Sequence, residues 1–126
     1  MTTIKSYTDI EQSKKLAEIL PLESADMLYY CSKESNALIS ESPFVRSFKE
    51  TNTFSYVPCW SLTTLLSILP DSIYNNTNEF SQLEFTKKSV AYIHGTTGGI
   101  KIGALKDNLI DTCYELILKL NELNLL

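Results

Sequence analysis

The chain has 126 residues and a mass of 14.2 kDa, which is typical of one domain with its own hydrophobic core. Eleven basic and 15 acidic side chains give a net charge of 11 − 15 = −4, which argues against general nucleic-acid binding through a basic surface. No apolar run approaches the roughly 18 residues that span a bilayer. The N-terminal Met-Thr-Thr-Ile-Lys lacks the apolar core of a secretory signal, so we expect a cytoplasmic protein with no membrane partner.

The N-terminal segment predicts a helix over residues 8–20. Thr8 and Glu11 have the spacing of a capping box, in which each side chain bonds the backbone amide of the other. Pro21 ends this helix, because proline disfavours the helical conformation of the preceding residue and donates no backbone hydrogen bond.

Strands and a polar insert follow this helix. Residues 25–31 are short, apolar and aromatic, and residues 54–57 alternate between apolar and polar; both patterns are typical of strands. Residues 32–53 form a polar insert with small apolar islands at 37–39 and 44–45. This insert predicts either a long loop or a pair of short edge strands, since structureless loops of this length are unusual in compact domains.

The second half of the chain predicts two helices around an antiparallel meander. Leucines at i, i+3, i+4 and i+7 indicate a helix over 61–69. Strands are predicted at 79–87, 90–94 and 100–105, and their short connections leave no room for crossover helices. A final helix over 108–123 begins with Asn108 or Asp107 as its cap. Its core stripe contains Leu109, Cys113, Leu116, Ile117 and Leu120.

These elements predict a single α+β domain over residues 1–126. An antiparallel sheet of three or more strands packs with about three helices in this arrangement.

Cysteines and the single histidine give little sign of chemistry. Cys31, Cys59 and Cys113 are an odd number with no close pair, so they indicate neither a disulfide framework nor a zinc site. A zinc site that joins all three to His94 is possible in principle, but buried thiols are the ordinary state of such cysteines. We therefore expect no metal, no cofactor and no catalytic residue.

The segment from His94 to Gly99 contains three glycines, as phosphate-binding loops do. Such a loop opens a helix, whereas this one joins two predicted strands, so a hairpin turn explains the glycines. Asp111 and Glu115 lie one helical turn apart, as paired acids can, and are interpreted as solvated side chains. The alternative that remains is an enzyme or small-ligand binder with a pocket near Tyr92 and His94.

Aromatic residues gather around the polar insert, and tyrosine and tryptophan are favoured both at interfaces and at core edges. The last helix is also apolar beyond its core stripe, which indicates a partner or a second copy of the chain. The sequence thus predicts a non-enzymatic interaction or accessory protein. Its candidate interface residues are Tyr29, Tyr30, Tyr56, Trp60, Tyr114 and Leu118.

Three segments carry a resemblance to a known group of proteins. They are residues 11–27, which contain Glu-Ile-Leu-Pro, residues 58–62, which read Pro-Cys-Trp-Ser-Leu, and residues 107–126. Together they resemble short uncharacterised proteins from gut Bacteroidetes that are associated with prophages and mobile elements. The resemblance implies a cytoplasmic bacterial setting and a mobile-element origin, and it implies no activity or catalytic residue.

Overall fold

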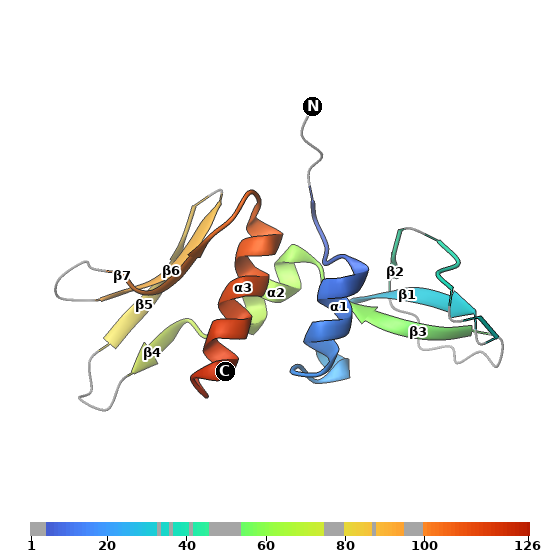
Figure 1. Cartoon of the computed structure of the whole chain (residues 1–126). Coiled ribbons are helices and arrows are strands. Elements are labelled where there is room, and N and C mark those ends of the chain that lie inside the picture. The colour runs from blue at the N-terminus through green and yellow to red at the C-terminus, as the bar shows by residue number, and fades with distance from the viewer. Residues whose placement is uncertain are drawn as a thin grey trace. The chain divides into compact units, whose positions relative to one another are not determined.

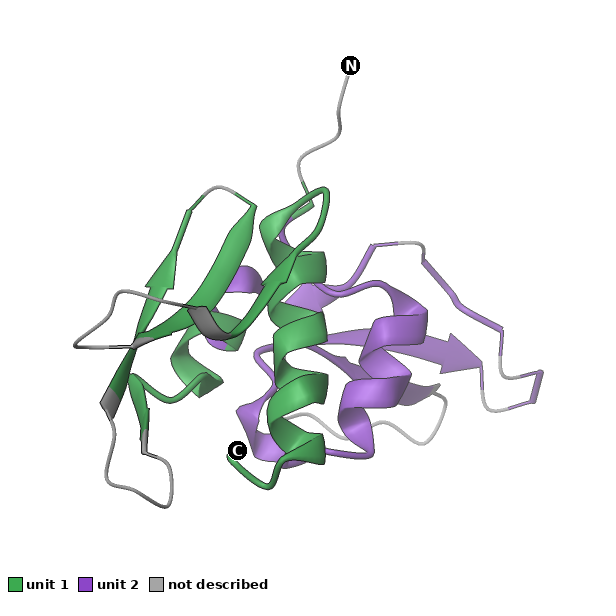
Figure 2. Ribbon diagram, turned by 60° about the vertical axis from the view of Figure 1, so that its left-hand side comes forward, with its two compact units in different colours: residues 1–5, 65–126 green, residues 6–64 purple. Residues whose placement is uncertain are grey.

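The computed structural model describes residues 5–32, 34–35, 37–40, 42–45, 54–74, 80–86, 88–94 and 100–126. Its helices and strands are labelled in Figure 1, and its two compact units are coloured in Figure 2. One unit contains residues 6–64 and the other contains residues 1–5 and 65–126. Each has an antiparallel sheet together with helix, which confirms the predicted α+β class. That the two units form a single domain stays a prediction.

A three-stranded antiparallel sheet forms the centre of the unit of residues 6–64. Its strands are β1 (Met27–Ser32), β2 (Phe44–Val45) and β3 (Phe54–Cys59), in the order β2-β1-β3. The strands predicted at 25–31 and 54–57 are therefore confirmed. Within the polar insert, β2 is a two-residue edge strand, and Leu38 forms an isolated bridge to Cys31. Helix α1 (Ile10–Ala17) packs against β3, and a short 3₁₀ helix, η1 (Leu22–Ser24), precedes β1.

Helix α1 begins at Ile10, two residues after the start of the predicted range 8–20, and its cap lies one residue later than predicted. Its cap is Asp9, whose carboxylate accepts from the Gln12 backbone N–H at 2.8 Å, while the Gln12 side chain accepts from the Asp9 N–H at 3.1 Å. The prediction of Thr8 as the cap, paired with Glu11, is wrong. Helix α1 also stops at Ala17, before the predicted end, and Pro21 instead precedes the 3₁₀ turn.

Thr8 lies at a buried junction between α1 and the sheet. Its backbone N–H donates to the Trp60 carbonyl oxygen at 3.0 Å, and its own carbonyl oxygen accepts from the Tyr29 hydroxyl at 2.7 Å. The Thr8 hydroxyl accepts from the backbone N–H of Trp60 at 3.2 Å and shares a 2.7 Å hydrogen bond with the Ser13 hydroxyl. These bonds satisfy groups that would be costly to bury unpaired, and they fasten the start of α1 to the sheet.

Helix α2 (Leu62–Ile68) confirms the helix predicted over 61–69. The boundary between the two units falls within this helix, after Thr64. Its start is held by Asp26, whose Oδ1 atom accepts from the Ser61 N–H at 2.9 Å. Burial alone would raise the pKa of Asp26, but hydrogen bonds from Ser61 and Thr64 outweigh it and lower the pKa below its ordinary value. The ionised carboxylate is therefore the form that the folded chain favours.

The unit of residues 1–5 and 65–126 contains a four-stranded antiparallel sheet in the order β4-β5-β6-β7. The strands are β4 (Ser72–Tyr74), β5 (Phe80–Phe85), β6 (Ser89–His94) and β7 (Ile100–Leu105). Strands β5, β6 and β7 confirm the predicted meander, whereas β4 was not predicted. Figure 1 shows α3 (Leu109–Glu122) beside this sheet, and it packs against β6 and β7.

Helix α3 follows its predicted bounds closely. Of the two predicted caps, Asn108 and Asp107, the structure shows Asn108, whose side chain accepts from the Asp111 N–H at 2.9 Å. The prediction of Leu109 in the core is wrong: Leu109 is half-buried, and the next residue, Ile110, is buried in its place. The other buried apolar residues are Cys113, Leu116, Ile117 and Leu120. Among the described residues, no helix is both long enough and apolar enough to cross a membrane.

Ser81 in β5 is fully buried, and its hydroxyl oxygen has no hydrogen-bond partner among the side chains and backbone that the structure describes. A buried unpaired hydroxyl costs free energy that an alanine at the same position would not. We expect Ser81→Ala to raise the free energy of unfolding by about 1 kcal/mol in urea titrations. Ser13→Ala is the matched control, because the Ser13 hydroxyl is equally buried but paired with Thr8, and it should lower stability. Equal destabilisation by both variants would contradict the prediction.

Candidate interaction surface

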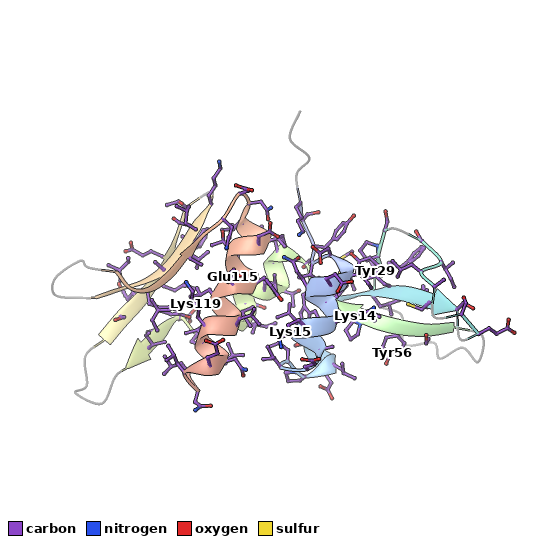
Figure 3. The ribbon with its side chains drawn as sticks, in the orientation of Figure 1. Lys14, Lys15, Tyr29, Tyr56, Glu115 and Lys119 are labelled. Carbon is purple, nitrogen blue, oxygen red and sulfur yellow. The ribbon has the colours of Figure 1, made fainter. Side chains whose placement is uncertain are left out.

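Side chains alternate between the two faces of the three-stranded sheet, and the strand register shows which residues share a face. Tyr30 in β1 lies opposite Tyr56 in β3, Leu28 lies opposite Pro58, and Leu28 also lies opposite Phe44 of β2. We call the face that carries Leu28, Tyr30, Ser32, Phe44, Tyr56 and Pro58 the outer face. The inner face carries Tyr29 and Cys59, which both donate to the carbonyl oxygen of Thr8, just before α1 begins. Figure 3 shows Tyr29 and Tyr56 on opposite sides of the β1–β3 ribbon.

The outer face exposes aromatic rings to solvent. Phe44 is 48% exposed and Tyr56 is 53% exposed, while Tyr30 between them is half-buried. The rings of Tyr30 and Phe44 contact each other with centroids 5.5 Å apart and planes tilted by 56°. Aromatic pairs favour such a tilted contact over face-to-face stacking. The two rings therefore form one continuous apolar surface.

The six predicted interface residues divide into three pairs. Tyr30 and Tyr56 lie together on the outer face as cross-strand partners. Tyr29 and Trp60 are buried: the Tyr29 hydroxyl donates to Thr8, and the Trp60 indole N–H donates to the Ser24 hydroxyl at 3.0 Å. These two present no surface to a partner, because the alternation of β1 turns Tyr29 inward and Trp60 joins the core beside Thr8.

Tyr114 and Leu118 lie on α3 in the other unit and are both half-buried. They do not belong to the outer face, and their contribution to an interface stays a prediction. Phe44 does belong to the outer face and was missed as a site residue. Its signal in the sequence was the apolar island at 44–45, which became informative only when its pairing with β1 was known.

Two cysteine thiols are poorly suited to nucleophilic chemistry. Burial raises the pKa of the Cys113 thiol to about 12. Burial also raises the pKa of Cys59, although hydrogen bonds from its neighbours act in the opposite direction. A thiolate is the reactive form of cysteine, so the un-ionised state disfavours catalysis at both positions. Cys31 is also buried, and all three cysteines are free thiols.

Tyr92, near which the sequence allowed a pocket, is a buried core residue. Its hydroxyl donates to the Pro70 carbonyl oxygen at 2.6 Å, so its proton is already engaged. Burial and the nearby Asp71 charge raise the pKa of the Tyr92 hydroxyl, which disfavours a role as a base. The side chain of His94 and residues 95–99 lie outside the described part of the chain.

The carboxylate of Asp111 is held by structural contacts. It accepts from the Lys5 ammonium at 2.7 Å and from the Asn108 side-chain amide at 2.8 Å. Lys119 on the same helix donates to the Gly103 carbonyl oxygen at 2.7 Å. Figure 3 labels Glu115 and Lys119 on the same helix. In the part of the chain that the structure describes, no three histidine, cysteine or carboxylate side chains gather in a group that could hold a metal ion.

Comparison with known proteins gave no match among family models, curated proteins or solved structures.

Proposed function

We propose that this protein is an interaction protein whose outer face receives a short apolar segment of a partner protein. The observation that carries the proposal is the cluster of Tyr30, Phe44 and Tyr56, which joins three aromatic rings from three strands on one solvent-facing surface. Tyrosine and phenylalanine are enriched in the cores of protein interfaces, where they supply apolar area. The half-exposed Tyr56 adds a hydroxyl group that can bond to the partner's backbone.

The chemistry of the face supports a protein partner. The outer-face side chains that the structure describes include no acidic or basic group: they are Leu28, Tyr30, Ser32, Phe44, Tyr56 and Pro58. Phosphate groups of nucleic acids are bound by lysine and arginine, so this face offers them little attraction. The net charge of −4 works in the same direction.

The size of the face supports a short segment as the occupant. A buried aromatic side chain covers about 150–250 Å², so two half-exposed rings and a half-buried third offer roughly 300 Å². Stable complexes between folded proteins bury about 800 Å² on each partner. A segment of a few apolar residues fits the smaller area, whereas a stable dimer through this face alone would need more.

The setting of this interaction is part of the proposal. The resemblance to proteins of gut Bacteroidetes supports a cytoplasmic bacterial protein, encoded by a prophage or another mobile element, that acts as an accessory factor through such contacts.

Phe44→Glu and Val45→Glu form a matched pair of variants for testing the outer face. Both residues are exposed on β2, at 48% and 79%, but alternation places Val45 on the opposite side of the strand. A photo-crosslinking amino acid at Tyr56 in the native host would capture the partner, which is then purified and titrated by calorimetry. We expect Phe44→Glu to weaken binding at least about tenfold and Val45→Glu to leave it nearly unchanged.

Two results would count against the proposal. One is equal binding by the Phe44 and Val45 variants, since the face would then make no contribution. The other is the absence of any protein captured by the crosslinker at Tyr56. The same crosslinker at the buried Trp60 position is the background control, and both proteins must be folded by circular dichroism.

A further inference from the structure

The direction of the backbone groups in the three-stranded sheet follows from two hydrogen bonds. The Ser32 N–H donates to the Ala37 carbonyl oxygen at 2.9 Å, and the Ile39 N–H donates to the Tyr30 carbonyl oxygen at 3.0 Å. Tyr30 and Ser32 therefore direct their backbone groups toward the β2 side of β1. Because this direction alternates along a strand, Tyr29 directs its groups toward β3.

The register then identifies the backbone groups at the outer edge of β3. Tyr29 pairs with Val57, so Val57 directs its N–H and carbonyl groups toward β1. Phe54, Tyr56 and Pro58 alternate with it and direct theirs away from β1. Trp60, two residues further on, follows the same alternation: its carbonyl oxygen accepts from the Thr8 N–H at 3.0 Å. At the Trp60 end, this edge is therefore already hydrogen-bonded to another segment of the same chain.

Strand β3 is an edge strand among the strands that the structure describes, since it pairs only with β1 in its sheet. An edge of this kind can pair with the same edge of a second copy, in antiparallel orientation about a twofold axis. Centred on Tyr56, that pairing would set Tyr56 opposite its own copy and Phe54 opposite Pro58. Proline has no N–H, so each of the two Phe54–Pro58 pairs would lose one of its two hydrogen bonds.

We infer that Pro58 prevents the outer edge of β3 from pairing with β3 of a second copy. Proline on an edge strand is a recognised means of blocking such pairing. The backbone nitrogen of Pro58, which carries no hydrogen, faces the outer edge of β3, where a second copy would need a donor. The ring of Pro58 is also buried, so packing alone is the rival explanation for its presence. The inference concerns the backbone edge and does not depend on the outer face acting as a docking site.

Pro58→Val supplies the missing N–H and keeps a similar apolar volume. We expect the variant to show about twice the solution mass of the parent protein by light scattering at equal concentration, with an unchanged circular dichroism spectrum. A folded variant with the mass of the parent would overturn the inference. If Pro58→Val and Pro58→Ala both fail to fold, Pro58 is retained for packing, and the inference is likewise overturned.

Two double variants separate the backbone edge from the side chains. Adding Tyr56→Pro to Pro58→Val removes the central N–H of the pairing and should restore the parent's mass. Adding Tyr56→Val to Pro58→Val removes the same ring but keeps the N–H, so this protein should still associate. Loss of association in both double variants would show that the Tyr56 ring, and not the edge, joins the copies.

Discussion

Trp60→Ala is expected to lower the free energy of unfolding by about 4 kcal/mol, because large-to-small substitution of a buried aromatic residue removes apolar burial and leaves a cavity. Trp60 has an exposed fraction of 0%, and its indole N–H is bonded to the Ser24 hydroxyl. Trp60 is the only tryptophan in the chain, so urea unfolding should be followed by circular dichroism and not by intrinsic fluorescence.

Two control variants separate the contributions to this loss. Trp60→Phe keeps most of the apolar volume but removes the indole N–H, so we expect a smaller loss of about 2 kcal/mol. Tyr56→Ala removes an aromatic ring that is 53% exposed and should cost less than about 1 kcal/mol. A loss below 1 kcal/mol in Trp60→Ala would place Trp60 outside the core and return it to the candidate interface.

Elements with a clear period or cap were predictable from the sequence. Helix α3 carries buried residues at helical spacing from Ile110 to Leu120, and Asn108 is a good cap residue, so both its type and its bounds were found. Strand β4 has only three residues and no period of its own. It is defined by the pairing of Ile73 and its neighbours with β5, because three residues are too few to show the alternation by which a strand is predicted.

The candidate surface was only partly predictable, because adjacent residues in a strand point to opposite faces. The sequence shows that Tyr29 and Tyr30 are both aromatic strand residues, but it does not show which side of β1 helix α1 covers. In the structure Tyr29 bonds Thr8 beside the start of α1, whereas Tyr30 lies on the outer face, where it contacts Phe44. Phe44 could not be placed from its own segment, since a two-residue strand takes its position from its partner.

The start of α1 shows how tertiary contacts decide between two local solutions. Thr8 with Glu11 and Asp9 with Gln12 both have capping-box spacing, and local rules do not distinguish them. The structure gives the cap to Asp9, because the Thr8 hydroxyl is already bonded to Ser13 and to the Trp60 N–H. Packing therefore selects the cap that leaves Thr8 available for the core.

Thr8→Val is expected to lower the free energy of unfolding by about 3 kcal/mol, because it removes a buried hydroxyl to which Trp60, Ser13 and Cys59 bond. Valine has nearly the shape of threonine but no hydroxyl, so the Trp60 N–H loses its acceptor and the Ser13 hydroxyl loses its 2.7 Å contact. Thr8→Ser keeps the hydroxyl and removes one methyl group, which should cost only about 1 kcal/mol. Chemical unfolding followed by circular dichroism measures all three proteins under the same conditions.

Asp9→Ala completes this test, since it separates the cap of α1 from the buried junction. Loss of a side-chain cap costs about 1 kcal/mol, so Asp9→Ala should be destabilising but clearly less so than Thr8→Val. If Thr8 were the cap and Asp9 a solvated neighbour, Asp9→Ala would be neutral and Thr8→Val would cost only about 1 kcal/mol. That order of effects would contradict the structure, because loss of a surface helix cap leaves an amide that water can reach, whereas loss of the Thr8 hydroxyl removes hydrogen bonds to three buried groups.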